Sequence, residues 1–433
     1  MVFSGDNSLG KSRARLITYM KTLWLCLYPM ENSDAGRSGT WLGAMAGGLL
    51  DSEAVELGII APSPVSQFTR HDYRQMKQWL VPARARLGRD GLPSASMIDA
   101  ILTAVKEFAP DLVHIWGTET FWGLLAARGL LTYPSLLEIQ GLKGQCAKVY
   151  FGGLTLSERL RCIGIKELLK RRTMHADRRD FARWGLYEEE IIRGHRFVDV
   201  QSPWVASHIK AINPAARLFP VNLPLRQPFY DADAWQYPGR PALFCSAAYT
   251  SPFKGLHVAV RALALLRKRI PDAHLRIAGT HQRVGIRQSG YMRWVNRMIR
   301  QLGLADAIEW LGPLNAAQVV AELKNAAALV IPTFIENCCT AMQEAMGIGT
   351  PVVVSYVGGI PSLGKDEDSC LFFAAGDEAM CAHQLERVLT DEELAMRLSR
   401  ESRKIATVRN DRQQIIHRQL EIYQQILGKV ARG

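Results

Sequence analysis

The sequence predicts an α/β fold made of two domains, each built around a parallel sheet. Over most of the 433 residues, short apolar runs rich in β-branched residues alternate with longer segments of helical periodicity, and this alternation is typical of parallel strands joined by helices. The chain is longer than the roughly 250–300 residues at which a single core stops growing, and a Pro- and Tyr-rich stretch at 218–238 indicates a crossing between domains. We therefore expect a disordered extension at 1–19, domains at 20–220 and 221–410, and a final helix at 411–433 that returns to the first domain.

The first domain is expected to begin with a buried strand at 23–28. Basic residues precede this apolar run, as in a signal peptide, but the run is short and Pro29 follows it without a small-residue cleavage site. Further apolar runs predict strands at 53–61, 111–116, 136–140 and 197–201. Helical periodicity, with Pro110 closing one segment, predicts helices at 40–50, 95–108 and 203–212, and 141–200 is mostly helical.

The second domain continues the alternation. Its expected strands lie at 242–247, 274–278, 308–311, 328–332 and 351–355. Its expected helices lie at 256–269, 291–302, 316–326 and 340–347, and helices fill 378–428. In such open α/β sheets, ligands bind beyond the carboxyl ends of the strands.

The chain carries a net charge of +12, which favours acidic partners. Part of the excess lies in the basic run 159–183, which is interpreted either as a solvated helical face or as a patch for an anionic membrane surface or acceptor lipid. The aromatic-plus-basic modules of nucleic-acid-binding proteins are absent, so no nucleic-acid partner is expected.

The eight cysteines form no C-x-x-C pair and no zinc spacing, and most are interpreted as small buried side chains in a reducing compartment. No run approaches the roughly 20 apolar residues of a membrane span. We therefore expect a cytoplasmic protein, peripheral on the inner face of the membrane if the basic run binds lipid.

The segment from Pro332 to Pro351 combines the features of an anion-binding site. A buried strand ends at Pro332, a loop carries Glu336, and a helix that contains Glu344 starts near Cys339. The unpaired N–H groups and the positive dipole end of a helix start suit a diphosphate. Carboxylates beside such a site suit ribose and hexose hydroxyls, because each accepts two hydroxyl hydrogen bonds. The spacing alone would equally fit a surface loop residue and a helix-face residue, but the whole segment is more specific.

This segment resembles the E-x7-E motif of the family-4 retaining glycosyltransferases, which have the GT-B fold of two Rossmann-like domains facing each other across a cleft. The family pattern of Pro-Ser, Glu, seven residues, Glu-Ala-Met, Gly and Pro-Val has its counterpart between Pro332 and Pro351. By this resemblance Glu344 would hold the ribose of the nucleotide, and Glu336 would contact the donor sugar. The loop backbone that would face the phosphates and the sugar is that of Asn337, Cys338, Cys339 and Thr340.

Further segments resemble the family in the same order along the chain. Lys254, which Gly255 follows, has the position of the family's lysine that neutralises the donor phosphates. The alternative interpretation of Lys254 is a solvated lysine in a surface loop. Three other positions match the donor side of the family. Gly279 ends a strand-to-glycine turn, Leu314 has the position of a nucleobase-pocket residue, and Gly359 allows close backbone approach. Acceptor-side or phosphate-side positions in the first domain are Gly36, Arg37, Gly39, Glu119 and Gln140. His114 lies within an expected strand and is interpreted as a packed histidine.

Two departures from the family pattern concern catalysis. The arginine that usually precedes the lysine is absent from 247–250, so Arg37 or Arg226 would have to supply the second cation, and Gln140 replaces a histidine. The resemblance implies hexosyl transfer from a nucleotide-diphosphate sugar to a glycan or lipid-linked acceptor, with retention at the anomeric carbon, in bacterial surface polysaccharide synthesis. No cofactor and no metal are expected, because backbone amides and Lys254 can neutralise the donor phosphates without one. The alternatives are a non-catalytic nucleotide-sugar-binding partner and another GT-B activity such as a sugar-nucleotide epimerase.

Overall fold

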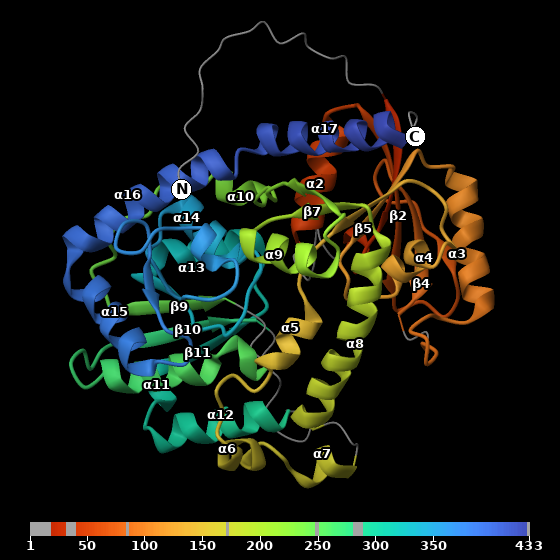
Figure 1. Cartoon of the computed structure of the whole chain (residues 1–433). Coiled ribbons are helices and arrows are strands. Elements are labelled where there is room, and N and C mark those ends of the chain that lie inside the picture. Colours follow the sequence, from red (N-terminus) through yellow and green to blue (C-terminus); the bar gives the residue numbers. More distant parts are fainter. Residues whose placement is uncertain are drawn as a thin grey trace, which may run out of the picture.

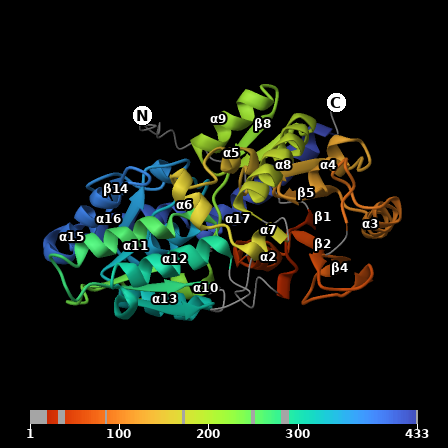
Figure 2. The same cartoon turned by 90° about the horizontal axis from the view of Figure 1, so that it is seen from below.

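Two sheets lie side by side and form the two halves of the molecule (Figure 1). A computed structural model describes residues 19–31, 40–83, 86–169, 173–246, 251–279 and 289–430. Seen from below (Figure 2), the elements β1, β2 and β4 occupy one side of the molecule and α11, α12 and α15 the other. The predicted extension at 1–19 lies almost entirely outside the described residues.

The first sheet has eight strands in the order β3-β4-β2-β1-β5-β6-β7-β8, and every neighbouring pair is parallel except β3 and β4. The strands are β1 (Met20–Leu25), β2 (Val55–Ser63), β3 (Thr69–Arg70), β4 (Lys77–Pro82), β5 (Leu112–Trp116), β6 (Ser135–Glu138), β7 (Phe197–Val200) and β8 (Arg217–Pro220). The chain builds the sheet outward from β1, first through β2 and then through β5. The strand order therefore reverses between β1 and β5, and such a switch point is where open sheets bind ligands.

The helices of the first half mostly cover the two faces of this sheet, and two short ones project away from it (Figure 1). The helices of this half are α2 (Thr40–Asp51), α3 (Ala95–Phe108), α4 (Trp122–Ala127), α5 (Lys143–Lys148), α6 (Leu156–Arg161), α7 (Ile165–Leu169), α8 (Met174–Gly194) and α9 (Pro203–Ile212). Trp24 of β1 packs in one core with α2, whereas its neighbours Leu23 and Leu25 pack in a second core with α3, α4, α8 and α9. The alternation of side chains along β1 thus supplies both cores.

The second sheet has six strands in the order β11-β10-β9-β12-β13-β14, and all of its pairs are parallel. The strands are β9 (Ala242–Ser246), β10 (His274–Ala278), β11 (Ile308–Gly312), β12 (Ala328–Ile331), β13 (Val352–Ser355) and β14 (Leu371–Phe373). Its helices are α10 (Gln227–Tyr230), α11 (Leu256–Leu266), α12 (Gly290–Gln301), α13 (Ala316–Asn325), α14 (Thr340–Ile348), α15 (Glu378–Thr390) and α16 (Glu392–Arg409). The order reverses between β9 and β12, which makes a second switch point.

The last helix, α17 (Arg412–Val430), leaves the second half and packs on the first. Figure 1 shows it running across the top of the molecule beside α2. Ile415, Ile416, Leu420 and Tyr423 of α17 are buried in the core that contains Trp24. Because each fully buried side chain of this size contributes about 1.5–3 kcal/mol, the helix ties the two halves together.

The structure differs from the sequence prediction at several strands. The first strand starts three residues earlier than 23–28, because Met20 already donates to the Ala54 carbonyl at 3.0 Å. Strands β3, β4, β8 and β14 were missed. Strand β8 ends at Pro220 and lies at the edge of the sheet, where a missing N–H costs no ladder hydrogen bond. Its Pro-rich surroundings had been interpreted as part of the crossing.

Within the described ranges, no helix combines the length and the apolar character that crossing a bilayer requires.

Candidate functional site

Both switch points open on one cleft, which encloses a cavity of about 730 Å³. Its walls come from the carboxyl ends of β1, β5 and β6 in the first sheet and of β9 and β12 in the second. The predicted site residues that line it are Glu119, Gln140, Lys254, Glu336, Cys338, Cys339 and Thr340. Residues far apart in the sequence therefore meet where open α/β sheets bind ligands.

Lys254 reaches the cleft from a short turn, Pro252–Lys254, that Gly255 ends in the left-handed region at φ 75°. A Cβ at position 255 would lie 1.8 Å from the Pro332 carbonyl oxygen, so only glycine lets this turn pack on the end of β12. The Lys254 Nζ lies 2.5 Å from Glu336 Oε1. Burial by itself would lower the pKa of Lys254, but the Glu336 carboxylate outweighs it and the pKa is raised. The side chain of Lys254 is therefore a cation at the carboxyl end of β12.

The loop that carries Glu336 is held by the glycine pair after β13. Gly359 donates its N–H to the Glu336 carbonyl at 2.9 Å. A Cβ at Gly358 would lie 2.0 Å from that carbonyl oxygen, and one at Gly359 would lie 1.9 Å from the Asn337 carbonyl oxygen. The expected close backbone approach at Gly359 thus occurs, and the backbone that it approaches is that of the loop at Glu336 and Asn337.

Asn337 points away from the cleft and joins the two halves of the molecule. Its amide nitrogen donates to the Ile139 carbonyl at 2.8 Å, and its amide oxygen accepts from the Ser202 hydroxyl at 2.8 Å. Ser202 is also the N-cap of α9 and accepts from the Val205 N–H. The side chain of Asn337 therefore positions the Glu336 loop against the first domain.

Helix α14 begins at Thr340, and its N-cap residue, Cys339, makes no capping hydrogen bond through its side chain. Thr340 lines the cleft, so the positive end of the helix dipole faces the cavity. Nearby N–H groups and Lys254 together create a positive wall suited to phosphate oxygens.

Glu344 lies on the buried face of α14 and is absent from the cavity lining. Its Oε1 accepts from Arg226 Nε and lies 2.8 Å from Arg226 Nη2. Burial raises the pKa of Glu344, and the Arg226 charge opposes part of that rise. Arg226, one of the two arginines that could have replaced the missing one, is thus already paired with Glu344. The structure brings Glu336 and Lys254 together, but it does not bring Glu344 into the same cavity.

Glu119 and Gln140 form the opposite wall, after β5 and β6. The Glu119 carboxyl is buried, and desolvation raises its pKa to about 7. Within the described part of the chain, Glu119 Oε2 and Gln140 Nε2 have no hydrogen-bond partner. Such groups are suited to contacts with a ligand hydroxyl.

The remaining predicted positions lie elsewhere. Gly279 donates to the Gly312 carbonyl at 2.8 Å, and Leu314 packs on the core of the second sheet. Neither residue lines the cavity. Gly36, Arg37 and Gly39 lie outside the described residues, as does the stretch 247–250.

Lys143 is a cleft residue that the sequence analysis missed. Its Nζ donates to the Glu119 carbonyl at 2.8 Å and lies 4.9 Å from the centre of the Trp184 ring. Desolvation lowers the pKa of Lys143. It follows the predicted strand at 136–140, so the rule that ligands bind at strand ends would have found it. Tyr28 and Trp41 also line the cleft and add aromatic surface.

Comparison with known proteins agrees with this architecture. Residues 231–405 match the family model described as glycosyl transferases group 1. The D-inositol 3-phosphate glycosyltransferase of Corynebacterium efficiens is 29% identical over 151 residues, which cover 35% of this chain and 35% of that protein. The chain thus matches about a third of the length of such relatives. The putative colanic acid biosynthesis glycosyltransferase WcaL of Escherichia coli K12 is 25% identical over 298 residues, which cover 67% of this chain and 66% of that protein.

The fold is shared with solved structures across nearly the whole chain. The crystal structure of Anabaena Alr3699/HepE in complex with UDP-glucose has a TM-score of 0.63 and 14% identity, and the match covers 96% of this chain and 100% of that chain. Together with the two parallel sheets, this likeness confirms the expected GT-B fold.

Proposed function

We propose that this chain, a group 1 glycosyl transferase by its residues 231–405, moves a sugar from a nucleotide-diphosphate donor to a hydroxyl of a glycan or lipid-linked acceptor, with retention at the anomeric carbon. One observation carries the proposal. A single cavity joins a cationic wall, made by Lys254 and the start of α14, to a wall with unpartnered polar groups at Glu119 and Gln140. The first wall suits a diphosphate and the second suits hydroxyls.

In the proposed reaction, the donor diphosphate lies against the start of α14 and Lys254. Lys254 then exchanges its contact with Glu336 for a phosphate oxygen, and Glu336 turns to the hydroxyls of the donor sugar. Charge that develops on the leaving diphosphate is stabilised by the lysine and the helix start, which are already in place. The acceptor hydroxyl attacks from the face that the diphosphate leaves, the leaving phosphate takes its proton, and Glu119 orients that hydroxyl.

Glu344 is proposed to hold the nucleotide ribose, with Arg226 opposing part of the rise that burial causes in the pKa of its carboxyl. This role would require the edge of the cleft next to α14 to admit the nucleoside. The complex of Alr3699/HepE with UDP-glucose makes uridine diphosphate sugars the first donors to test.

The test is a thermal-shift screen against nucleotide-diphosphate sugars, including UDP-glucose, on wild type, Glu344→Ala and Glu322→Ala. Glu322 is the matched control, because it forms a similar ion pair with Arg276 away from the cleft. A bound donor adds about 2.7 kcal/mol of stability at a hundredfold excess over Kd. We expect a donor shift in wild type and Glu322→Ala that shrinks in Glu344→Ala.

No shift with any donor would contradict the proposal, as would equal shifts in all three proteins. Donor binding without transfer to any acceptor would instead favour a non-catalytic nucleotide-sugar-binding partner, and turnover of the donor alone would favour an epimerase.

We further propose that the acceptor is presented at the inner face of a membrane, in surface polysaccharide synthesis. Helices α6 and α7 project at the lower edge of the molecule (Figure 1) and overlap the basic run 159–183. They carry leucines that are between 58% and 79% exposed, at Leu156, Leu160, Leu168 and Leu169. Exposed leucines beside arginines suit a surface of anionic lipid. The relation to WcaL agrees with a polysaccharide role.

Co-sedimentation with anionic phospholipid vesicles at low salt tests the membrane proposal. We expect wild type and Val408→Ser to sediment with the vesicles and a Leu168→Ser/Leu169→Ser variant to stay in solution. Val408 is the control because it is 74% exposed on α16, away from α6 and α7. Failure of the wild type to bind would refute this location without touching the proposed reaction.

A further inference from the structure

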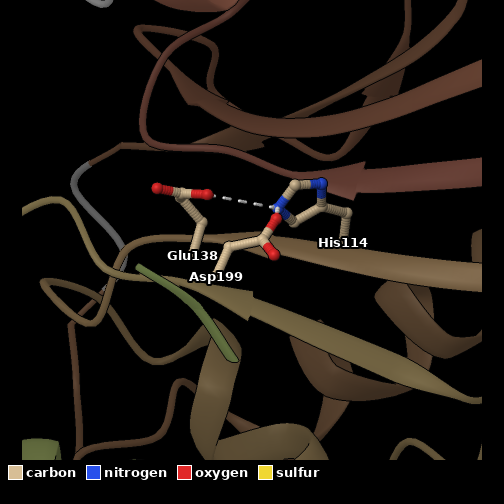
Figure 3. Close-up of side chains that lie close together, drawn as sticks. All are labelled: His114, Glu138 and Asp199. Carbon is tan, nitrogen blue, oxygen red and sulfur yellow. Dashed lines mark ion pairs between the residues drawn. The ribbon is translucent and has the colours of Figure 1, made fainter. Parts of the chain in front are cut away.

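Three side chains that commonly bind metals converge inside the first sheet, away from the cleft lining. His114 is on β5, Glu138 ends β6 and Asp199 is on β7, and all three are completely buried. Figure 3 shows the two carboxylates directed at the imidazole ring. His114 Nε2 lies 4.0 Å from Glu138 Oε2 and 4.0 Å from Asp199 Oδ2. One ligand atom from each residue lies within 4.8 Å of the other two.

Strand register creates this convergence. Glu138 pairs directly with Asp199, and His114 pairs with the residue two before Glu138, which is Leu136. Because side chains two residues apart on a strand share a face, all three project from the same side of the sheet. That side is the one covered by α17, whose Tyr423 and Gln419 contact the group.

Within the described ranges no cation contacts the two carboxylates, and Arg418 acts on Asp199 only from beyond ion-pair distance. Among the described residues, neither one forms a hydrogen bond or an ion pair with a lysine or arginine. Glu138 Oε1 accepts from Gln201, and Asp199 Oδ2 accepts from Gln419 at 3.1 Å. Glu138 Oε2, Asp199 Oδ1 and His114 Nε2 are buried without a hydrogen-bond partner in the described part of the chain. Buried carboxylates without a counter-charge are costly, so they must either keep their protons or share a cation.

The separations favour the shared cation. A distance of 4.0 Å exceeds the range of about 2.7–3.2 Å in which N–H···O hydrogen bonds form. Three ligand atoms bound to one zinc-sized ion, at about 2.0–2.2 Å each, lie roughly 3.3–3.8 Å from one another. The three side chains therefore need to approach one another by roughly half an ångström to one ångström to bind one ion.

The surrounding contacts are those of a second coordination shell. His114 Nδ1 lies 2.8 Å from the Tyr423 hydroxyl, which accepts from Trp24 Nε1 at 3.2 Å. If His114 Nδ1–H donates to that hydroxyl, its Nε2 lone pair points at the carboxylates, and metal-binding histidines are oriented in this way. Gln201 holds Glu138 by the oxygen remote from His114, whereas Gln419 donates to Asp199 Oδ2, the oxygen that faces His114.

We propose that His114, Glu138 and Asp199 bind one divalent transition-metal ion, of the Zn²⁺ or Mn²⁺ class, beneath α17. One imidazole nitrogen with two carboxylates suits these ions better than Mg²⁺ or Ca²⁺, which prefer oxygen ligands alone. A divalent charge also balances the two carboxylates. The ion holds β5, β6 and β7 together under the last helix and has no part in the proposed transfer reaction, so the two proposals can fail separately.

Gln201 provides the route for the ion. Its side chain lines the cleft cavity and also a second cavity of about 680 Å³ beside α17. Its amide nitrogen donates to Glu138, so rotation of this one side chain would open the cluster to solvent on either side.

The test measures metal bound to the untagged full chain. Protein is incubated with Zn²⁺ or Mn²⁺, desalted and analysed by mass spectrometry of its elements, and Co²⁺ gives a second readout through its visible absorption bands. We expect one ion per chain in wild type and in His257→Gln, and at least a tenfold loss of affinity in His114→Gln and Asp199→Asn. His257 is the control because it is a buried histidine whose two ring nitrogens already have partners, Tyr291 and Gly152.

Wild-type protein that retains no transition metal after this treatment would overturn the proposal without the need for any variant. The melting temperature gives a second, independent test of metal binding. We expect Zn²⁺ or Mn²⁺ to raise the Tm of wild type and a chelator to reverse the rise, with neither effect in Asp199→Asn. If Asp199→Asn is as stable as wild type and metals shift neither protein, protons rather than an ion balance the carboxylates, and the proposal is wrong.

Discussion

Replacement of Gly255 by alanine tests how closely the Lys254 turn is packed on the end of β12. The backbone at 255 has φ 75°, and an alanine Cβ there would lie 1.8 Å from the Pro332 carbonyl oxygen. The left-handed conformation alone costs a residue with a Cβ about 1–2 kcal/mol. Overpacking adds typically about 1–3 kcal/mol. We therefore expect Gly255→Ala to lower the free energy of unfolding by roughly 2–5 kcal/mol.

Gly303→Ala is the matched control, because Gly303 follows a helix at φ 67° and has nothing within 4 Å of its Cβ position. It should lose only the conformational cost, about 1 kcal/mol. Urea denaturation measures the free energy of unfolding of both variants and of wild type. In thermal unfolding, a difference of about 1 kcal/mol appears as a shift of roughly 2–4 °C in Tm for domains of this size. The displaced turn should also weaken donor binding in Gly255→Ala only. Equal losses of stability in the two variants would refute the close approach and, with it, the geometry that positions Lys254.

Two further predictions concern the charges in the cleft. Lys254→Met should lower donor affinity by about 10- to 100-fold, because a charge-assisted contact to phosphate is worth roughly 1.5–3 kcal/mol. Calorimetric titration measures this affinity, with Lys268→Met, which changes an exposed lysine on the same domain, as the control. Equal donor affinities of the two variants would contradict the prediction. Glu119 should make stability depend on pH, because its pKa is raised from 4.5 to about 7 in the folded protein. Between these two pH values the folded protein keeps the proton that the unfolded chain releases. The free energy of unfolding therefore falls as pH rises through this window. Urea titrations at both ends of the window should show a smaller fall in Glu119→Gln, by up to roughly 3 kcal/mol, and identical slopes would mean that the Glu119 carboxyl is not desolvated.

The second half of the molecule was predicted well because its signals are local. The strand before Pro332, the helix that contains Glu344 and the glycines after β13 follow from apolar periodicity and turn chemistry within short windows of sequence. In the first half, β8 was missed because a strand at a sheet edge tolerates Pro220. Edge position is a property of the finished sheet, so the sequence around that proline carries no sign of it.

The sequence by itself determined the α/β class, the order of most strands and helices, and the residues that follow the ends of the predicted strands. Only the tertiary structure decided which of those residues meet. It pairs Lys254 with Glu336, pairs Arg226 with Glu344 and turns Asn337 toward the first domain. Periodicity and turn residues report on neighbours along the chain, whereas these contacts depend on sheet order and on how the two halves pack. The group formed by His114, Glu138 and Asp199 arises in the same way, because each strand alone shows one buried polar residue and only their register makes a site.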